Sequence, residues 1–494
     1  MSEAHRSAGF FRSDCVKISS APAAYLIYAL VCPSIFPCHN KNLFILGNSI
    51  VKYRQSVTMR RMNKLSTRSY KGARDYYPED KRLQKYLFGV MRTVCERYGY
   101  EEYDAPILEP TELYLNKGNQ EIIDEQTYTF TDRGDRSVTL RTEMTPTVAR
   151  MVAGKRQELG YPLRWYSIPQ CWRYERMQRG RGREFYQLNV DIFGDDSIAA
   201  EHELLLITTD LMKSYGASDE MYEIRVNSRV FLDYLIEKRL GAAGDAKKRI
   251  LQLLDKRSKI AKEDFYKQLS QENISLLGDG AQVFFDKVFE VQQIDDLPGD
   301  DLRSHSSLVK LAELLKLCRQ SGINNISFDP TITRGFDYYT DIVFEVFDTH
   351  PDNNRSMFGG GRYDNLLEAF GAEPVPTVGF GMGDHTLQNF LELHELLPSL
   401  AATTEVYVVA LGDTYKAALD ITTQLRQQNI NVALDALDRK PEKAIKTAEK
   451  KGIEYVLFIG QNELDSGEFR LRNIITGQEN QGDIEAVAQE LLSR

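Results

Sequence analysis

Two short motifs and one arginine-rich stretch hold side chains that could bind a small polar molecule beside a phosphate. Residues 333–339 read TRGFDYY: a single cation, a glycine, an acid and two adjacent tyrosines, whose side chains would point to opposite faces of a strand. Residues 358–364 read FGGGRYD, and such a glycine run lets the backbone approach a ligand closely. Arg334 beside the tyrosines disfavours a dry core, so we predict that the segment lines a site.

The third stretch, residues 171–194, reads as two strands joined by a basic loop. Its residues 173–183 contain five arginines, and guanidinium groups bind phosphate through paired donors. A flexible, solvated loop would show the same charge, so charge alone does not decide between the two. The return strand, residues 185–193, places two aromatic and three polar side chains on one face: Phe185, Gln187, Asn189, Asp191 and Phe193. Polar groups between aromatic rings favour a lined site.

Several elements must hold these residues in place. A helix is predicted over residues 78–97, where acids fill the first turn after Pro78 and apolar residues recur at helical spacing. Residues 103–108 read as a short edge strand interrupted by Pro106. The remaining predictions are strands over residues 163–174 and 378–383 and within 326–347 and a helix over 386–396. A charged helical insertion is predicted over residues 228–325, with amphipathic helices at 249–262 and 308–318.

The C-terminal part alternates between strands and helices after a linker at residues 397–404. Strands are predicted over residues 406–411, 431–434, 455–459 and 469–475, and helices over 414–427, 441–451 and from Asp483 onward. Such alternation predicts a small α/β domain.

The composition is typical of a soluble protein of two or three domains. The 494-residue chain is 42% hydrophobic and 27% charged. Its six cysteines form no C-x-x-C pair, so we expect no metal site. The net charge of −9 argues weakly against a general nucleic-acid coat, but it allows a local basic site on an acidic body.

The first 61 residues differ from the rest of the chain. Eight Lys and Arg against Glu3 and Asp14 give a balance of +6, which leaves −15 for the remainder of a chain of net charge −9. The apolar run at residues 23–32 is too short to span a bilayer and is similar to a weak secretory signal or an acid-poor transit peptide. We favour the alternative that residues 1–61 are a disordered extension upstream of the working protein. That protein would start at Met62 and be cytoplasmic.

The RGxDYY and GGRYD motifs, together with the arginine-rich hairpin, resemble those of the histidyl-tRNA synthetases, a family of class II aminoacyl-tRNA synthetases. The resemblance runs from about Tyr70 to the C-terminus, and it implies a strand over residues 140–145, which are similar to the family's LRxExT strand. It implies an α+β fold, with an antiparallel-sheet catalytic domain at residues 62–227 and 326–396, a helical insertion at 228–325, and a C-terminal α/β anticodon-binding domain at 405–494. It also implies a homodimer that activates L-histidine with ATP and Mg²⁺ and transfers it to tRNA(His), without contact with a membrane.

The resemblance also implies a role for each candidate residue. Arg334 and Arg173 are the catalytic cations at the α-phosphate, and Arg334 stands where other class II enzymes use an extra metal ion. The histidine-binding set is Glu143, Met144, Thr145, Arg173, Gln187, Asp191, Arg334, Tyr338 and Tyr339. Within it, Glu143 pairs the α-ammonium group, while Asp191 and Tyr339 serve the two ring nitrogens. ATP is held by Arg173, Glu175, Arg181 and Phe185, and the acceptor end of the tRNA is read by Arg176 and Gln178.

One position departs from the family pattern. The third class II motif usually reads GLxR, with its arginine over adenine, whereas residues 379–386 read GFGMGDHT and Thr386 takes that place. The main alternative is the non-catalytic, histidine-binding regulatory paralogue of ATP phosphoribosyltransferase, which generally lacks the anticodon-binding domain and an intact RGxDYY. A prolyl or threonyl synthetase of class IIa does not fit RGFDYY and GGRYD.

Overall fold

The computed structural model describes residues 43–46, 49–52, 65–115, 126–175, 180–257, 260–271, 280–334, 338–353, 355–437 and 439–493. The chain divides into two units, residues 1–67 and 68–494. In the first unit, β1 (Leu43–Leu46) pairs with β2 (Ser49–Lys52) in antiparallel register, a short hairpin that the sequence does not predict. The rest of residues 1–61, and Met62, lie outside the described residues.

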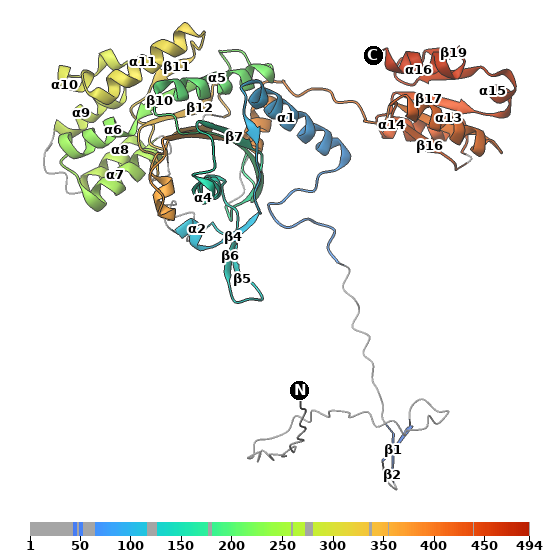
Figure 1. Cartoon of the computed structure of the whole chain (residues 1–494), viewed down its shortest axis with the longest axis horizontal. Helices are drawn as coiled ribbons and strands as arrows, with labels where there is room; N and C mark the ends of the chain where they lie inside the picture. Colours follow the sequence, from blue (N-terminus) through green and yellow to red (C-terminus); the bar gives the residue numbers. More distant parts are fainter. Residues whose placement is uncertain are drawn as a thin grey trace, which may run out of the picture. The chain divides into compact units, whose positions relative to one another are not determined.

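The second unit is built around a nine-stranded sheet (Figure 1). Its strand order is β11-β10-β12-β13-β14-β9-β7-β3, and β8 pairs with β9 off this path. Neighbours are antiparallel except at the two edges, where β10 with β11 and β3 with β7 are parallel. The strands are β3 (Glu101–Glu102), β7 (Leu163–Ser167), β8 (Gln170–Trp172), β9 (Glu184–Phe193), β10 (Tyr222–Ser228), β11 (Ile326–Phe328), β12 (Ile342–Asp348), β13 (Ser356–Arg362) and β14 (Thr377–Gly383).

The two faces of this sheet pack against different helices. Alternate residues of β9, Leu188, Val190 and Ile192, join one core with α1 (Pro78–Arg97), α5 (Ile198–Ser214) and α12 (Asp384–Leu393). Phe193 and Val343, from the opposite face, join a second core with α4 (Thr145–Lys155) and the 3₁₀ turn Leu366–Phe370. In Figure 1 the sheet curves around α4, so the second face is the concave one. The predicted site residues of β9 lie on this concave face.

Two smaller assemblies lie in the part of the chain that precedes the linker at residues 397–404. A three-stranded sheet of order β4-β6-β5 consists of β4 (Leu108–Pro110), β6 (Ser137–Leu140) and β5 (Thr129–Thr131), next in sequence to α2 (Glu112–Leu115). The predicted insertion is helical: α6 (Arg229–Tyr234), a π-helical turn (Leu235–Arg239), α7 (Gly244–Lys256), α8 (Lys262–Gln271), α9 (Gly280–Phe289), a 3₁₀ turn (Ile294–Asp296), α10 (Asp300–Arg303) and α11 (Ser306–Gln320). Its buried leucines belong to the same core as α1 and α5.

The C-terminal part is an α/β domain, as predicted. Its sheet has the order β16-β15-β17-β18-β19, with parallel pairs at β15 and antiparallel pairs beyond β17. The strands are β15 (Val406–Ala410), β16 (Val432–Asp435), β17 (Tyr455–Ile459), β18 (Phe469–Asn473) and β19 (Glu479–Gly482). The helices are α13 (Tyr415–Gln427), α14 (Pro441–Lys450), α15 (Gln461–Ser466) and α16 (Ile484–Leu492). The sequence patterns do not predict β19 and α15, because both are short and polar.

Several predicted elements end earlier than expected, and proline accounts for two of them. The strand predicted over residues 163–174 is divided at Pro169, which lacks the N–H that a ladder needs. The strand predicted over residues 140–145 ends at Leu140, and Thr145 instead begins α4 with Pro146 in its first turn. Residues 103–107 form no strand, and the helix predicted over residues 249–262 is α7, which ends at Lys256.

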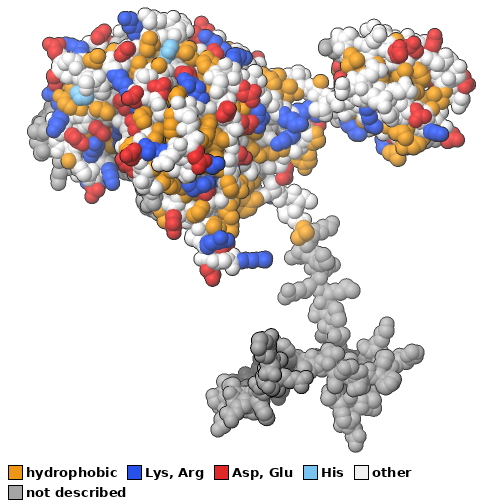
Figure 2. All heavy atoms as spheres, viewed as in Figure 1, with side chains coloured by type: hydrophobic (Ala, Val, Ile, Leu, Met, Phe, Trp, Pro, Cys, Tyr) orange, Lys and Arg blue, Asp and Glu red, His pale blue; other side chains and the backbone are white. Residues whose placement is uncertain are grey.

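The surface carries both signs of charge. Figure 2 shows Lys and Arg interspersed with Asp and Glu and with hydrophobic atoms over the face that it presents. In the part of the chain that the structure describes, no helix is both long enough and apolar enough to cross a bilayer.

Candidate active site

The floor of the candidate site is a block of four glycines in the middle of the sheet. Antiparallel register aligns residues of neighbouring strands into rows that share one face. One row reads Val343, Gly361, Gly379, Asp191 and Trp165 across β12, β13, β14, β9 and β7. The next row on the same face reads Glu345, Gly359, Gly381, Asn189 and Ser167.

Each of these glycines makes room for one predicted site residue. A Cβ on Gly379 would collide with the Asp191 carboxylate, and a Cβ on Gly359 would collide with the Arg334 guanidinium. A Cβ on Gly381 would stand 2.8 Å from Gln187 Nε2. A Cβ on Gly361 would stand 3.0 Å from Tyr339 Cδ1. In this structure the glycine motifs therefore admit side chains to the concave face, a use that the sequence reading does not foresee.

Three tyrosines pack together beside this floor. The Tyr338 and Tyr339 ring centroids lie 4.8 Å apart, and both rings contact that of Tyr363 at 5.6 and 6.4 Å. All three side chains are buried. The prediction that Tyr338 and Tyr339 occupy a strand and point to opposite faces is wrong, because they lie in the connection before β12 and join one cluster. The preceding residues 335–337 lie outside the described part of the chain.

Asp191 is a buried carboxylate held by a tyrosine hydroxyl. The Tyr363 hydroxyl donates a hydrogen bond to Asp191 Oδ1. Burial raises the pKa of Asp191 to about 7, although this hydrogen bond opposes the rise. Tyr363 follows β13 directly, so the GGRYD motif supplies the partner of Asp191. The sequence reading does not assign this role to Tyr363.

A second buried carboxylate, Glu143, is influenced by two cations. Tyr338 donates a hydrogen bond of 3.3 Å to Glu143 Oε2. Burial raises the pKa of Glu143, while Arg173, the Tyr338 hydrogen bond and Arg334 act in the opposite direction. The structure therefore brings together four residues of the predicted histidine-binding set: Glu143, Arg173, Arg334 and Tyr338. Met144 and Thr145 follow Glu143 in the chain: Met144 is fully buried, and Thr145 is the first residue of α4.

The two predicted catalytic arginines enter the site from different elements. Arg334 lies with φ +48°, in the left-handed region. Its Nη1 donates to the Phe344 carbonyl oxygen at 3.5 Å and stands 3.7 Å from Glu345 Oε1. Arg173, after β8, donates from Nε to the Thr142 carbonyl oxygen at 3.0 Å. Because both arginines oppose the pKa rise of Glu143, both act on the same carboxylate.

Most of the predicted ATP residues gather around Arg173. The Arg173 guanidinium carbon lies 5.3 Å from the centroid of the Phe185 ring. Glu175 lies between Arg173 and Arg181, with N–O distances of 3.8 and 3.4 Å. The loop residues Arg176 and Gln178, predicted to contact the tRNA acceptor end, lie outside the described residues.

The structure places other groups near the departure at Thr386. The Thr386 hydroxyl donates to the Gly383 carbonyl oxygen at 3.0 Å, within the first turn of α12. Two positions earlier, Asp384 accepts a 2.8 Å bond from Arg74, which also pairs with Glu184 at 3.2 Å. This Arg74 cluster ties the segment before α1 to β9 and α12. This cluster is not predicted from the sequence, because nothing local in the sequence pairs Arg74 with a residue 310 positions away.

Arg362 of the GGRYD motif does not enter the pocket. Its guanidinium forms a two-point ion pair with Glu201 of α5, with distances of 2.6 and 2.7 Å. Both side chains are 3% exposed. It also donates to the carbonyl oxygens of Asp195 and Ser197 at 3.0 and 3.3 Å. This buried, bidentate pair fixes the end of β13 against the start of α5.

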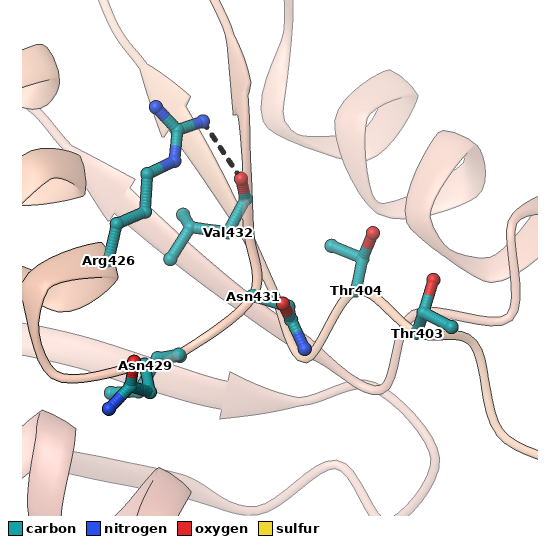
Figure 3. A pocket seen from close by; sticks show the side chains of 7 residues that line it. Thr403, Thr404, Arg426, Asn429, Asn431 and Val432 are labelled. Carbon is teal, nitrogen blue, oxygen red and sulfur yellow. Dashed lines mark hydrogen bonds between the residues drawn. The ribbon is translucent and has the colours of Figure 1, made fainter.

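The C-terminal domain carries two further polar features. A pocket of about 510 Å³ is lined by Thr403, Thr404, Arg426, Asn429, Ile430, Asn431 and Val432, and Arg426 donates to the Val432 carbonyl oxygen there (Figure 3). None of these seven is a predicted site residue.

Exposed lysines at positions 440, 443, 446 and 450 recur every three or four residues on α14 and its N-cap. Among the described residues, the ion pairs of this domain involve arginines, not these lysines.

Metal binding has little support from the described side chains. They contain no group of three His, Cys, Asp or Glu residues that could hold a metal ion. Glu345 is a carboxylate within the site, 3.7 Å from Arg334. A single carboxylate suits Mg²⁺ that keeps its remaining ligands from phosphates and water.

Comparisons with known proteins separate the part built around the nine-stranded sheet from the C-terminal α/β domain. A family model described as histidyl-tRNA synthetase matches residues 72–387, and one described as an anticodon binding domain matches residues 405–494. A histidine–tRNA ligase of Leptospira biflexa is 41% identical over 415 residues, which cover 83% of this chain and 94% of the relative. A chloroplastic/mitochondrial histidine–tRNA ligase of Arabidopsis thaliana is 38% identical over 421 residues, 85% of each chain.

Solved structures agree on the fold. The histidyl-tRNA synthetase of Nostoc sp. PCC 7120 aligns with a TM-score of 0.74 at 24% identity, covering 87% of this chain and 100% of the other. A Bacillus halodurans protein described as an ATP phosphoribosyltransferase regulatory subunit/histidyl-tRNA synthetase aligns with a TM-score of 0.66 at 21% identity, covering 80% of this chain and 99% of the other. At these identities the likeness concerns the fold, and it is consistent with the predicted α+β class.

Proposed function

The chain belongs to the histidyl-tRNA synthetase family, and from that premise we propose that it joins L-histidine to tRNA(His) at the expense of ATP. The observation that carries the proposal is the pair of buried carboxylates beside one tyrosine cluster. Tyr338 donates a hydrogen bond to Glu143, and Tyr363, whose ring contacts that of Tyr338, donates one to Asp191. Arg173 and Arg334 both lower the pKa of Glu143 against burial. A free amino acid with a polar ring presents the complementary groups: an ammonium, a carboxylate and a ring N–H.

In the first step, an oxygen of the histidine carboxylate attacks the α-phosphorus of ATP. The bond from that phosphorus to its bridging oxygen breaks, and pyrophosphate leaves. Little covalent work falls to the protein in such a displacement, so positioning and charge stabilisation provide the rate. We assign the charge stabilisation to Arg173 and Arg334, both of which oppose the rise in the pKa of Glu143. Glu143 pairs with the α-ammonium group, and Thr145 lies beside it.

The side chain of histidine is assigned to the glycine floor. Asp191 accepts from one ring N–H, Tyr339 serves the other nitrogen, and Gln187 and Tyr338 line the same space. The adenine ring is assigned to Phe185, with Glu175 and Arg181 at the nucleotide. Glu345 is the carboxylate that would help to hold Mg²⁺ with bound ATP, and the ion would supply charge neutralisation at the phosphates.

In the second step, a hydroxyl of the terminal ribose of tRNA(His) attacks the carbonyl carbon of the adenylate, and AMP leaves. Arg176 and Gln178 of the hairpin loop are proposed to read the acceptor end of the tRNA. Gln178→Ala should then slow aminoacylation and spare pyrophosphate exchange. Equal losses in both assays would assign the loop to ATP instead.

The assembly and location of the protein are part of the proposal. We propose a homodimer in the cytoplasm. An apolar surface supports the dimer: Leu108, Leu115 and Phe130 of the small sheet and α2 are 38%, 53% and 50% exposed. Light scattering at micromolar concentration would test the dimer, and cell fractionation would test the location.

An assay of ATP–pyrophosphate exchange across the twenty amino acids tests the function. Histidine alone should drive exchange, because a site that hydrogen-bonds a polar side chain rejects analogues lacking it by roughly 10⁴-fold. Histidine binding without exchange would favour the regulatory paralogue of ATP phosphoribosyltransferase. The match of residues 405–494 to an anticodon-binding domain speaks against that paralogue.

A further inference from the structure

Asp191 and Glu143 differ in what offsets their burial. Two arginines lower the pKa of Glu143 against the effect of burial, whereas no described residue forms an ion pair with Asp191. The hydrogen bond from the Tyr363 hydroxyl is the interaction that lowers the pKa of Asp191 against burial. A buried carboxylate without a cation depends strongly on its hydrogen bonds. The ionisation and orientation of the Asp191 carboxylate therefore depend on Tyr363.

The two oxygens of Asp191 are not equivalent. Oδ1 accepts from Tyr363 and occupies the space that a Cβ on Gly379 would take. Oδ2 receives no hydrogen bond from a described residue. With Oδ1 engaged by the protein, the carboxylate offers one oxygen to a bound molecule.

The position of Tyr363 is fixed independently of Asp191. Its backbone N–H donates to the Thr377 carbonyl oxygen at 2.8 Å, and its ring packs against Tyr338 and Tyr339. Burial and the charge of Asp191 hold the pKa of Tyr363 well above its ordinary value. Tyr363 therefore keeps its proton and remains a donor at any working pH.

We propose that Tyr363 is a positioning residue for amino-acid selection, whose hydroxyl holds Asp191 over Gly379 so that a single carboxylate oxygen, Oδ2, faces the side chain of the bound amino acid. This proposal rests on the proposed function and deepens it. One fixed acceptor selects a ligand with one N–H donor at that point. A ligand without that donor leaves a buried carboxylate unpaired and is rejected.

The test compares Tyr363→Phe with the wild-type full chain in histidine-dependent pyrophosphate exchange. Removing a hydrogen bond to a charged group should raise the KM for histidine by roughly ten- to 100-fold, with a much smaller change in kcat. The acid limb of kcat/KM against pH should also move to higher pH, because Asp191 loses the donor that favours its ionised form. An unchanged KM and pH profile would overturn the proposal.

Tyr407→Phe is the matched control. The Tyr407 hydroxyl donates to the buried carboxylate of Asp435 at 2.8 Å, so the variant removes the same kind of bond in the C-terminal domain. It should lower the melting temperature to a similar extent and leave the KM for histidine unchanged. Equal effects of both variants on that KM would reduce Tyr363 to a general structural role and overturn the proposal.

Asp191→Asn provides a second variant, which does not depend on Tyr363→Phe being folded. The Tyr363 hydroxyl should hold the amide oxygen and turn the amide NH₂ toward the ligand, so the KM for histidine should rise by 100-fold or more. A KM near that of the wild type would show that the side chain at 191 rotates freely, against the proposal. Direct calorimetry of histidine binding to the wild type and Tyr363→Phe distinguishes failure of the proposed ligase function from failure of the role proposed for Tyr363. Wild-type binding without exchange refutes the ligase function, whereas equal affinities refute the role of Tyr363.

Discussion

Substituting alanine for two glycines of the same strand provides a sharp test of the glycine floor. Gly379 and Gly381 lie two residues apart on β14 and face the same side of the sheet. At Gly379 a Cβ would collide with the Asp191 carboxylate and stand 2.8 Å from the Val190 carbonyl oxygen. At Gly381 a Cβ would meet the amide end of Gln187 at 2.8–3.4 Å, which is the far end of a flexible side chain. The added atom is identical, and the neighbour that must move differs.

The expected magnitudes follow from those neighbours. Gly379→Ala should destabilise the fold by about 1–3 kcal/mol, the usual cost of overpacking, because the Val190 backbone cannot move away. It should also raise the KM for histidine by roughly 100-fold, since Asp191 must leave its position. Gly381→Ala should cost less than about 1 kcal/mol, because Gln187 can change rotamer.

The assays are urea unfolding and pyrophosphate exchange at varied histidine concentration. Unfolding reports on strain, and the KM for histidine reports on Asp191. If Gly379→Ala keeps the wild-type KM, the floor does not position Asp191 and the reasoning fails.

Four further changes probe the other assignments. Arg334→Ala should reduce the rate of adenylate formation by roughly 10²–10³-fold and histidine affinity less, as for loss of a preorganised donor; equal losses in single-turnover rate and calorimetric affinity would make Arg334 a binding residue. Because burial raises the pKa of Asp191 to about 7, its carboxylate is mostly ionised at pH 8 and mostly protonated at pH 6; the KM for histidine should rise by up to about tenfold as pH falls across this window, and a flat profile would contradict the assignment. Lys443→Ala with Lys446→Ala should weaken tRNA affinity and lower its salt dependence by about two ions, while pyrophosphate exchange stays unchanged. A chain starting at Met62 should charge tRNA as well as the full chain does, and a large loss of charging would show that residues 1–61 contribute.

The sequence predicts the local elements of the chain better than it predicts the contacts of the candidate site residues. Hydrophobic periodicity locates α1 and the C-terminal strands, because both patterns are local. The residues that contact Asp191 and Asp384 lie far away in the chain: Tyr363 is 172 positions from Asp191, and Arg74 is 310 positions from Asp384. No local pattern encodes such pairs, and it is the register of β9, β13 and β14 that brings the first of them together.

Glycine shows where reading a motif by residue type goes astray. A run of three glycines predicts that the backbone approaches a ligand closely; in the structure Gly359, Gly360 and Gly361 lie within β13 at the centre of the sheet, and Cβ atoms on Gly359 and Gly361 would meet side chains of the candidate site. Gly359 and Gly361 face the pocket, and Gly360 faces Phe380 on the other side. Likewise Arg362, a charged residue beside the site in sequence, is buried against Glu201. Because side chains alternate between the two faces of a strand, the position of each residue in β13 determines which face it occupies. This alternation can be applied only when the segment is known to be a strand.

The distribution of charge in the site is enough to orient an amino acid. Arg173 and Arg334 act on Glu143, so that end of the pocket offers both a carboxylate for an ammonium group and cations for a carboxylate. Asp191 lies among Tyr363, Tyr338 and Tyr339, where no described cation pairs with it. A zwitterion that entered with its ends reversed would place its carboxylate beside Asp191 and leave two buried like charges unpaired, which is strongly unfavourable. Under the proposed function, we therefore expect the α-carboxylate to face the arginines, where the α-phosphate of ATP is assigned, and the side chain to face Asp191. The arrangement that is proposed to select the side chain would then also present the reacting oxygen to the nucleotide.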